Sequence, residues 1–537
     1  MAMAMPFLAS LSFLTKSIFH KLQIRFLSLR KALHFQASWS YRLILSYVHP
    51  LFFHIIYFLS TSFIGFLLLE RIRFRNPANN KPRAIDIFFT SVSAATVSSM
   101  STVEMEVFSN PQLIVLTVLM LIGGEVFTSA LGLLFKKAQL KRRLMAHVEP
   151  TSSANVPIEP SNTDHHIVVF RTASFLSKEL KYNSTRQLAY VLIAYLVVLH
   201  VAGSISVVLY MRIVSSAREV LREKEISIST FSVFTTVSSF SSCGFIPTNE
   251  NMIVFKKNTG LLWLIIPQVL LGNTLFPSCL RLVVWILKRS TKRVEFDYLL
   301  ESSENIGYYH FLPHRHSVLL ALTVVGFLVV QLVLVCSMEW HSEAFAGLTS
   351  YQKLMGALFM SVNSRHTGES TVNLSQLSSA ILVLFVLMMY LPPYTSFLPV
   401  QDEGRNSSTA SNDKKSVGLI RSLLMSQLSY LTISVILICI TERRKLSEDP
   451  LNFNVLNIVV EVIRQESFHL SNAYGNVGFS TGYSCDLQLR PNGNCKDTWY
   501  GFVGRWSAKG KVILIFVMFF GRLKKFSMDG GKAWKLG

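Results

Sequence analysis

Long runs without a charged side chain dominate this sequence and limit what it can fold into. A helix needs about 20 mostly apolar residues to cross the hydrocarbon core of a bilayer, and only 15% of the 537 residues are charged. Such runs occupy residues 43–69, 111–135 (with Glu125 as its one acid), 187–211, 258–280, 316–338, 370–401 and 422–441, and a shorter run follows at 512–521. The sequence therefore predicts an all-α polytopic membrane protein with eight transmembrane helices.

The basic residues between these runs predict how the chain is oriented. Cytoplasmic loops of membrane proteins are enriched in Lys and Arg, and residues 1–45 contain six of them and no acid. With an even number of spans, both termini are expected in the cytoplasm. The loop at residues 70–83 would then be external, and its five basic residues argue against this orientation. The net charge is +21, and we expect the basic residues to contact anionic lipid rather than nucleic acid.

A semi-polar segment of small residues recurs between successive apolar runs. In the first copy, eight of the fourteen residues at 89–102 carry a hydroxyl group. The four copies read FFTSVSAATVSSMS, FTTVSSFSSCGFIP, LFMSVNSRHTGES and AYGNVGFSTGYS. Each is too polar to cross a membrane and too apolar for an ordinary loop. The sequence therefore predicts four repeats of one unit, which consists of a span, a semi-polar hairpin and a second span.

The four hairpins predict an ion pathway. Irregular backbone is tolerated at membrane depth only where it is buried or lines a water-filled path, and a ring of carbonyl and hydroxyl oxygens suits an alkali cation. Glycine fits the narrowest point because it has no side chain and adopts strained backbone conformations. Aligning Phe88 with Phe234 and Leu358 gives a predicted selectivity filter of Ser98, Gly244, Gly368 and Gly478. The alternative is a set of small-residue contacts between helices, which does not explain four corresponding positions.

At these residues the chain resembles the plant HKT transporters of the Trk/Ktr/HKT superfamily. The resemblance covers nearly the whole chain and includes TSVSAATVSSMSTVEMEVFSN, CGFIPTNENM, SVNSRHTGES, YLPPYTSFLP, AYGNVGFSTGYSC and FVMFFGRLKKF. It implies four M1–pore helix–M2 repeats around one pseudo-fourfold pore, in a plasma-membrane subunit that forms a homodimer with one pore per subunit. It also implies the same four filter positions.

The serine at the first filter position carries a further implication of the resemblance. Family members with serine there resemble the sodium-selective subgroup, which retrieves Na⁺ from xylem sap and supports salt tolerance. A serine side chain would narrow or re-coordinate one quadrant of the ring, and K⁺ is the larger ion. Transport of K⁺, or of Na⁺ and K⁺ together, is the alternative within the same superfamily.

The predicted organisation follows from the repeats and the charges. The N-terminal tail is expected at residues 1–42 and the C-terminal tail at 526–537. The four repeats are expected at residues 43–136, 188–289, 316–401 and 417–525. Cytoplasmic linkers are expected between them, at residues 137–187, 290–315 and 402–416.

Charged residues near the filter have two interpretations each. Four acids, Glu104, Glu106, Glu250 and Glu369, are expected at the external pore mouth, where they would concentrate cations; the alternative is ordinary solvated loop acids. Arg522, in the FFGRLKKF segment, would lie in the pore below the filter if the resemblance holds, and would act as an electrostatic brake. The alternative is an arginine that extends to the membrane interface from a helix end.

Other side chains are expected to be structural. Arg365 and His366 precede Gly368, and we expect them to brace the filter by anchoring a carboxylate. His49, His54 and His200 lie within spans and are expected to be helix contacts. Cys485 and Cys495 flank a loop that is expected to be external. A disulfide between them and two free thiols are both compatible with the sequence.

The remaining cysteines form no metal-ligand pattern, and no metal is expected apart from the permeating Na⁺ or K⁺. A membrane-embedded transferase would need convergent acids, bases or metal ligands. The sequence has no DxD motif, no Ser-His-Asp grouping and no nucleotide-binding glycine loop, so we expect a transporter without a cofactor rather than an enzyme.

Residues 464–472 depart from the family pattern, in which the fourth pore helix leads almost directly into AYGNVGFS. The extra residues RQESFHL and Asn472 would lengthen that helix by roughly 12 Å at ~1.5 Å per residue. They would also put charges at membrane depth, at a cost of at least ~2.5 kcal/mol each unless paired. Alternatively, they loop out between subunits or towards the outer face.

We predict that the chain as written conducts poorly, or that this segment is retained intron sequence. Removing residues 464–470 and Asn472 should then raise sodium current at equal surface expression, because the filter regains its register. Equal currents from both forms would refute this, and transcript sequencing across the junction tests independently whether the segment is translated.

Overall fold

The computed structural model describes residues 50–75, 81–148, 162–391, 394, 427–463, 482–485, 488, 495 and 497–527. The chain divides into two compact units, Met1–Tyr57 and Phe58–Gly537. The described part of the first unit is the start of helix α2. The remaining elements belong to the second unit. The described residues contain helices and no β-strand. The all-helical class expected from the sequence is therefore confirmed.

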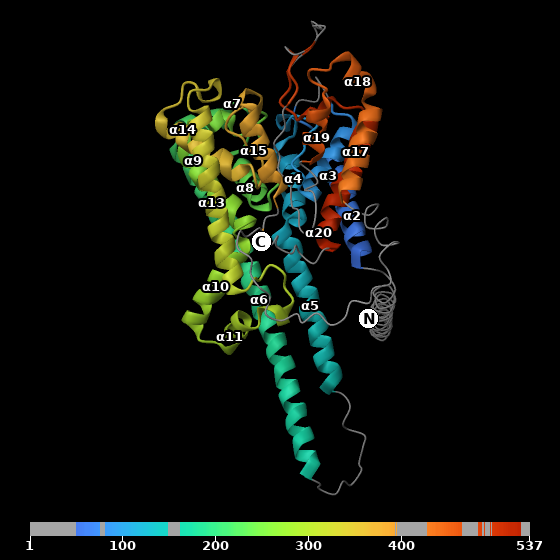
Figure 1. Ribbon diagram of the computed structural model, residues 1–537, viewed down its shortest axis with the longest axis vertical. Coiled ribbons are helices and arrows are strands. Elements are labelled where there is room, and N and C mark those ends of the chain that lie inside the picture. Colours follow the sequence, from blue (N-terminus) through green and yellow to red (C-terminus); the bar gives the residue numbers. More distant parts are fainter. Residues whose placement is uncertain are drawn as a thin grey trace, which may run out of the picture. The chain divides into compact units, whose positions relative to one another are not determined.

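The helices of the second unit can be grouped by the four predicted repeats, whose number and bounds stay a prediction (Figure 1). The first repeat contains α2 (Pro50–Arg71), α3 (Ala84–Thr96), α4 (Asn110–Gly123) and α5 (Glu125–Val148). The second contains α6 (Asn162–Ile213), α7 (Ser215–Glu223), α8 (Ile228–Ser241), α9 (Thr259–Gly272) and α10 (Phe276–Thr291). The third contains α13 (His314–Glu339), α14 (Ser350–Asn363) and α15 (Ser379–Tyr390), and the fourth α17 (Gln427–Thr441), α19 (Val455–Ile463) and α20 (Ala508–Ser527).

Shorter elements connect these helices. They are α11 (Val294–Glu301), α12 (Ser303–Ile306), α18 (Arg443–Glu448) and the 3₁₀ turns Met105–Val107, Ile253–Phe255, Glu343–Phe345, Leu374–Gln376 and Phe502–Arg505. Most of the predicted linker at 137–187 is helical, because α5 extends through its start and α6 begins at Asn162. Beyond the other helices, α5 and the first half of α6 run side by side (Figure 1).

Length and composition identify fewer membrane spans than the sequence predicts. Within the described ranges, three helices are long and apolar enough to cross a membrane: α2, α6 and α13. The number rises to five if each bent pair counts as one span, since α4 and α5 meet at 53° and α9 and α10 at 85°. Shorter apolar helices coincide with α3, α15 and α17. The polytopic membrane fold is clear from these helices, and the count of eight spans stays a prediction.

The hydroxyl-rich segments form short buried helices in which several side chains bond to the backbone of their own helix. In α3, Thr90 Oγ1 donates to Asp86 O at 2.9 Å, and Thr96 Oγ1 donates to Val92 O at 2.7 Å. The same bond to the carbonyl four residues back occurs at Ser232 in α8 and Ser361 in α14. Ser and Thr can make this bond without leaving the helix. These bonds satisfy part of the buried hydroxyl groups, whereas the hydroxyls of Thr235, Thr236 and Ser238 in α8 have no hydrogen-bond partner among the described residues.

The second helix of the first two repeats breaks where it meets the end of its own pore helix. A Cβ atom added to Gly123 would collide with the carbonyl oxygen of Ala95, and one added to Gly272 with that of Phe240. Both helices end at these glycines, and α5 and α10 then leave in new directions. Glycine is required here because the two backbones approach too closely for any side chain.

The repeats pack in a cyclic order. The pore helix α8 packs against α4 of the first repeat, and α14 packs against α9 of the second. At the other end of the chain, α20 of the fourth repeat packs against α3 of the first, and Figure 1 shows the red α20 beside the blue α3. Three neighbouring pairs of repeats thus meet in the same way, which is the arrangement expected for helices around one axis.

Candidate ion pathway

The ends of the first two pore helices have the same backbone conformation. Val97 and Ser242 each end a helix in the left-handed region, with φ of 58° and 63°. The next amide in each case donates to the carbonyl five residues back: Ser98 N to Ser93 O at 2.8 Å, and Cys243 N to Ser238 O at 2.9 Å. Ser98 therefore corresponds to Cys243, and the residue that corresponds to Gly244 is the next one, Ser99.

The predicted pairing of Ser98 with Gly244 and Gly368 is wrong by one residue. Ser99 has φ of 65°, close to the 71° of Gly244 and the 80° of Gly368. The Ser98 hydroxyl instead lies 2.7 Å from Thr96 Oγ1 at the end of α3. The sequence offers two registers because Phe88 and Phe89 are adjacent, and the helix ends select Phe89 as the partner of Phe234.

Oxygen atoms from three repeats meet at Ser99. Its hydroxyl donates to the carbonyl of Cys243 and lies 3.0 Å from Thr367 O. A Cβ atom on Gly244 would collide with Thr367 O and lie 2.6 Å from Ser99 Oγ. The space here is therefore narrow and lined by oxygen atoms. Such oxygen atoms can replace the water molecules that hydrate a cation. Gly478, the fourth predicted filter residue, lies outside the described residues.

A cavity leads from this narrow point to the loops that follow the filter segments. It has a volume of about 540 Å³, and Ser99, Gly244 and Gly368 line it together with Glu104, Glu250 and Asp497. The C-terminal ends of α3, α8 and α14 come just before these filter positions. Helix C-termini carry partial negative charge, so the inner end of the cavity favours cations.

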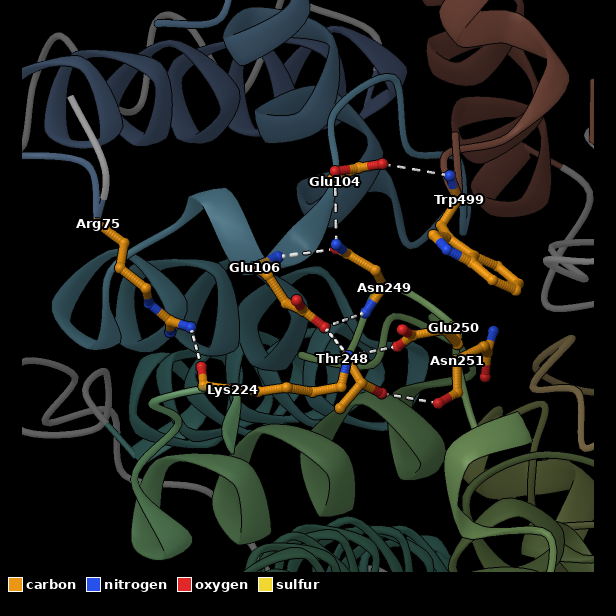
Figure 2. Close-up of polar contacts among 9 residues, drawn as sticks. All are labelled: Arg75, Glu104, Glu106, Lys224, Thr248, Asn249, Glu250, Asn251 and Trp499. Atoms are coloured by element: carbon orange, nitrogen blue, oxygen red, sulfur yellow. Dashed lines mark hydrogen bonds and ion pairs between the residues drawn. The ribbon is translucent and has the colours of Figure 1, made fainter. Parts of the chain in front are cut away.

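Two of the predicted mouth acids, Glu104 and Glu106, tie loops together (Figure 2). Glu104 accepts from Trp499 N at 3.3 Å and from Asn249 Nδ2 at 3.4 Å. Glu106 accepts from Asn249 N at 2.9 Å. Glu104 thus joins the first repeat to the second and the fourth. Glu106 reaches the second repeat through the same asparagine, so both acids have structural partners in the loops that follow the filter segments.

Lys224 is a residue of this region that sequence reasoning missed. Its Nζ lies 2.5 Å from Glu106 Oε1 and 2.5 Å from Glu250 Oε2 (Figure 2). Partial burial would lower the pKa of Lys224, but the hydrogen bonds and charges of the two carboxylates outweigh it and raise that pKa. Lys224 is 118 residues from Glu106 in the sequence, and no local pattern indicates their contact.

Glu369 does not lie at the mouth. Its side chain is fully buried, and Ser239 Oγ of α8 donates to Glu369 Oε1 at 2.6 Å. The corresponding positions in the first two repeats, Met100 and Phe245, are also buried. The turn after each filter residue directs the next side chain away from solvent. For that reason, the expectation that Glu369 lies at the pore mouth is wrong.

The basic residues of the third hairpin are buried. The guanidinium of Arg365 lies 4.9 Å from the ring centroid of Phe327. His366 Nε2 lies 2.6 Å from Thr274 Oγ1, and its Nδ1 lies 2.5 Å from Val362 O. His366 thereby links α14 to the break between α9 and α10. The anchoring of a carboxylate by these residues stays a prediction.

Arg522 lies within the helix bundle. It is 3% exposed, its Nη2 donates to the carbonyl of Gly123, and its guanidinium lies 5.5 Å from the ring centroid of Phe58. The bend after Gly123 frees that carbonyl to accept this bond. Arg522 therefore does not extend from an exposed helix end, and the electrostatic brake stays a prediction.

The remaining predicted residues have structural surroundings. A disulfide joins Cys485 and Cys495, whose Cα atoms are 5.9 Å apart. His200 Nδ1 lies 2.7 Å from Leu196 O of its own helix, and the ring packs against Phe240. His49 lies outside the described residues. Within the part of the chain that is described, no group of three or more His, Cys, Asp or Glu residues is placed to bind a metal.

Comparison with known proteins identifies the family. The probable cation transporter HKT1;4 of Oryza sativa subsp. japonica is 52% identical over 498 residues, which cover 90% of this chain and 97% of the relative. The chain belongs to the plant HKT cation transporters. The sodium transporter HKT1 of Arabidopsis thaliana is 51% identical over 468 residues, which cover 85% of this chain and 90% of that protein.

Two further comparisons agree with the HKT assignment. The profile of the TrkH family, described as a cation transport protein, matches residues 171–398. The crystal structure of the potassium transporter TrkH from Vibrio parahaemolyticus has the same fold, with a TM-score of 0.50 at 12% identity over 89% of this chain and 83% of that one. The chain is therefore a multi-pass membrane cation transporter, and the alternative of a membrane-embedded enzyme is set aside.

Replacing Arg522 tests whether it lies on the permeation path. We predict that Arg522→Ala raises inward cation current, because removing a fixed positive charge lowers the barrier for a cation. A tenfold increase would correspond to about 1.4 kcal/mol. Current should be measured at equal surface expression, with Arg522→Lys as the charge-retaining control. Unchanged current and voltage dependence in Arg522→Ala would exclude the brake.

Proposed function

We propose that this HKT protein is a channel-like uniporter selective for Na⁺ in the plasma membrane. The observation that carries the proposal is the hydroxyl side chain of Ser99 at a position where the second and third repeats have glycine. The 51% identity to the sodium transporter HKT1 of Arabidopsis thaliana supports the same ion. As the family resemblance implies, the role in the plant would be control of root-to-shoot Na⁺ and salt tolerance. The basic residues of the N-terminal tail support a cytoplasmic location for both termini.

The proposed path begins in the cavity of about 540 Å³ at the outer loops. A cation would exchange its water there for the carbonyl oxygens of Cys243 and Thr367 and the hydroxyl of Ser99. The Ser99 hydroxyl is held by those carbonyls, so it narrows the ring on one side. A smaller cation tolerates the narrowing better than K⁺. Transport of K⁺ is the alternative, and selectivity measurements separate the two.

The neighbouring serines provide a matched pair for this test. We predict that Ser99→Gly admits K⁺ while Na⁺ flux continues, with the permeability ratio of K⁺ to Na⁺ rising about tenfold, which is about 1.4 kcal/mol. Ser98→Gly should leave the ratio unchanged, because Ser98 Oγ bonds within the end of α3. Reversal potentials in oocytes with each ion outside measure the ratio.

Two outcomes would contradict the proposal. If the unsubstituted protein carries K⁺ as well as Na⁺, it is not sodium-selective. If Ser99→Gly has the same permeability ratio as the unsubstituted protein, the Ser99 hydroxyl does not set the selectivity.

A further inference from the structure

The ammonium group of Lys224 lies between two carboxylates that belong to different repeats. Glu106 is in the 3₁₀ turn after the first filter segment, and Glu250 is in the loop after the second. Lys224 follows α7, at the outer end of the second repeat. Its Nζ is 2.5 Å from one oxygen of each acid, and its side chain is 16% exposed (Figure 2).

The position of Lys224 is fixed by its own backbone and by α7. Arg75 Nη1 donates to the Lys224 carbonyl at 2.5 Å. Ala217 and Leu221 bury one face of α7, and Ile226 N donates to Leu221 O at 2.9 Å, which closes the end of that helix. The side chain therefore reaches the two acids from an anchored base, rather than from a free loop.

Two carboxylates that converge on one point could contribute two of the oxygen ligands of a hard divalent cation. Calcium binds carboxylate and carbonyl oxygens at about 2.3–2.6 Å, and each of the two oxygens lies 2.5 Å from the Lys224 nitrogen. A single point thus lies at the Ca²⁺ bonding distance from two carboxylates. The ammonium group already occupies that point and lowers the charge of the pair from −2 to −1.

This point lies beside the route that the proposed function gives to the permeating ion. Glu250 lines the cavity that Ser99, Gly244 and Gly368 also line, and Asn249 and Glu104 line the same cavity. A divalent cation held between Glu106 and Glu250 would place two positive charges at the wall of this cavity. At short range such a charge opposes the entry of a monovalent cation.

We propose that Lys224 is a specificity-determining residue whose ammonium group takes the place that a divalent cation would otherwise occupy between Glu106 and Glu250. The tethered charge keeps external Ca²⁺ from binding at the mouth, while the cavity retains enough negative charge to admit monovalent cations. The inference rests on the proposed function, because it assumes that cations pass through this cavity.

The test removes the charge and titrates external Ca²⁺ against sodium current. Lys224→Met keeps most of the side-chain volume without the charge, and Lys224→Arg retains the charge. Extracellular calcium-binding modules bind Ca²⁺ at about 0.1 to about 1 mM. Over that range, current through Lys224→Met should fall severalfold and recover on chelation of Ca²⁺. Current through the unsubstituted protein and Lys224→Arg should change little.

A double variant separates exclusion of Ca²⁺ from a merely structural tie. In Glu106→Gln/Lys224→Met the carboxylate pair is gone, so block by Ca²⁺ should disappear although the tie is still broken. If Lys224→Met expresses poorly, Lys224→Gln provides a second neutral form that can still hydrogen-bond to the acids. The inference would be overturned if the neutral variants reach the cell surface and their currents depend on Ca²⁺ as that of the unsubstituted protein does. It would also be overturned if neither Lys224→Met nor Lys224→Gln reaches the cell surface. Absence of cation current in the unsubstituted protein would instead refute the proposed function.

Discussion

Backbone that leaves a helix at membrane depth has no water to satisfy it, and this constraint shapes the centre of the molecule. The structure meets it at the ends of α3 and α8 with left-handed residues, Val97 and Ser242, and an amide that bonds back to the helix. Ser99 then uses its hydroxyl to bond the carbonyls of two other repeats. Because irregular backbone survives only where such groups find partners or line a path, the hairpins of the repeats stabilise one another.

The contacts of the loops after the filter segments depend on the same arrangement of repeats. Each loop after a filter segment must return the chain to the next helix, and its polar groups meet those of neighbouring repeats. Asn249 bonds Glu104 and Glu106, Ser370 N donates to Asn251 Oδ1, and Gly501 N donates to Ser101 O. The acids at the mouth therefore hold the loops in place as well as contributing charge. A sequence that concentrates acids near a pore does not by itself distinguish these two roles.

Much of the fold could be predicted from the sequence because its signals are local. Charge-free runs mark helices, and recurring hairpins mark the repeats. The register of the first filter residue could not be fixed in this way, because Phe88 and Phe89 allow two alignments and only the helix end distinguishes them. The burial of Glu369 and the contact of Lys224 with Glu106 depend on packing between repeats, which no single segment encodes. Gly478 and the segment at 464–472 lie outside the described residues, so their predictions stand as made.

We propose that the ion path passes Ser99 rather than Ser98. Silver ions react with thiols and enter cation pathways, so cysteine at each position reports whether the path reaches it. Block by external Ag⁺ should be measured on the sodium current of Ser99→Cys and Ser98→Cys, with the unsubstituted protein, whose Cys243 is buried, as the baseline. We expect lasting block of Ser99→Cys, whereas the current of Ser98→Cys should respond to Ag⁺ as that of the unsubstituted protein does. Lasting block of Ser98→Cys alone would contradict it.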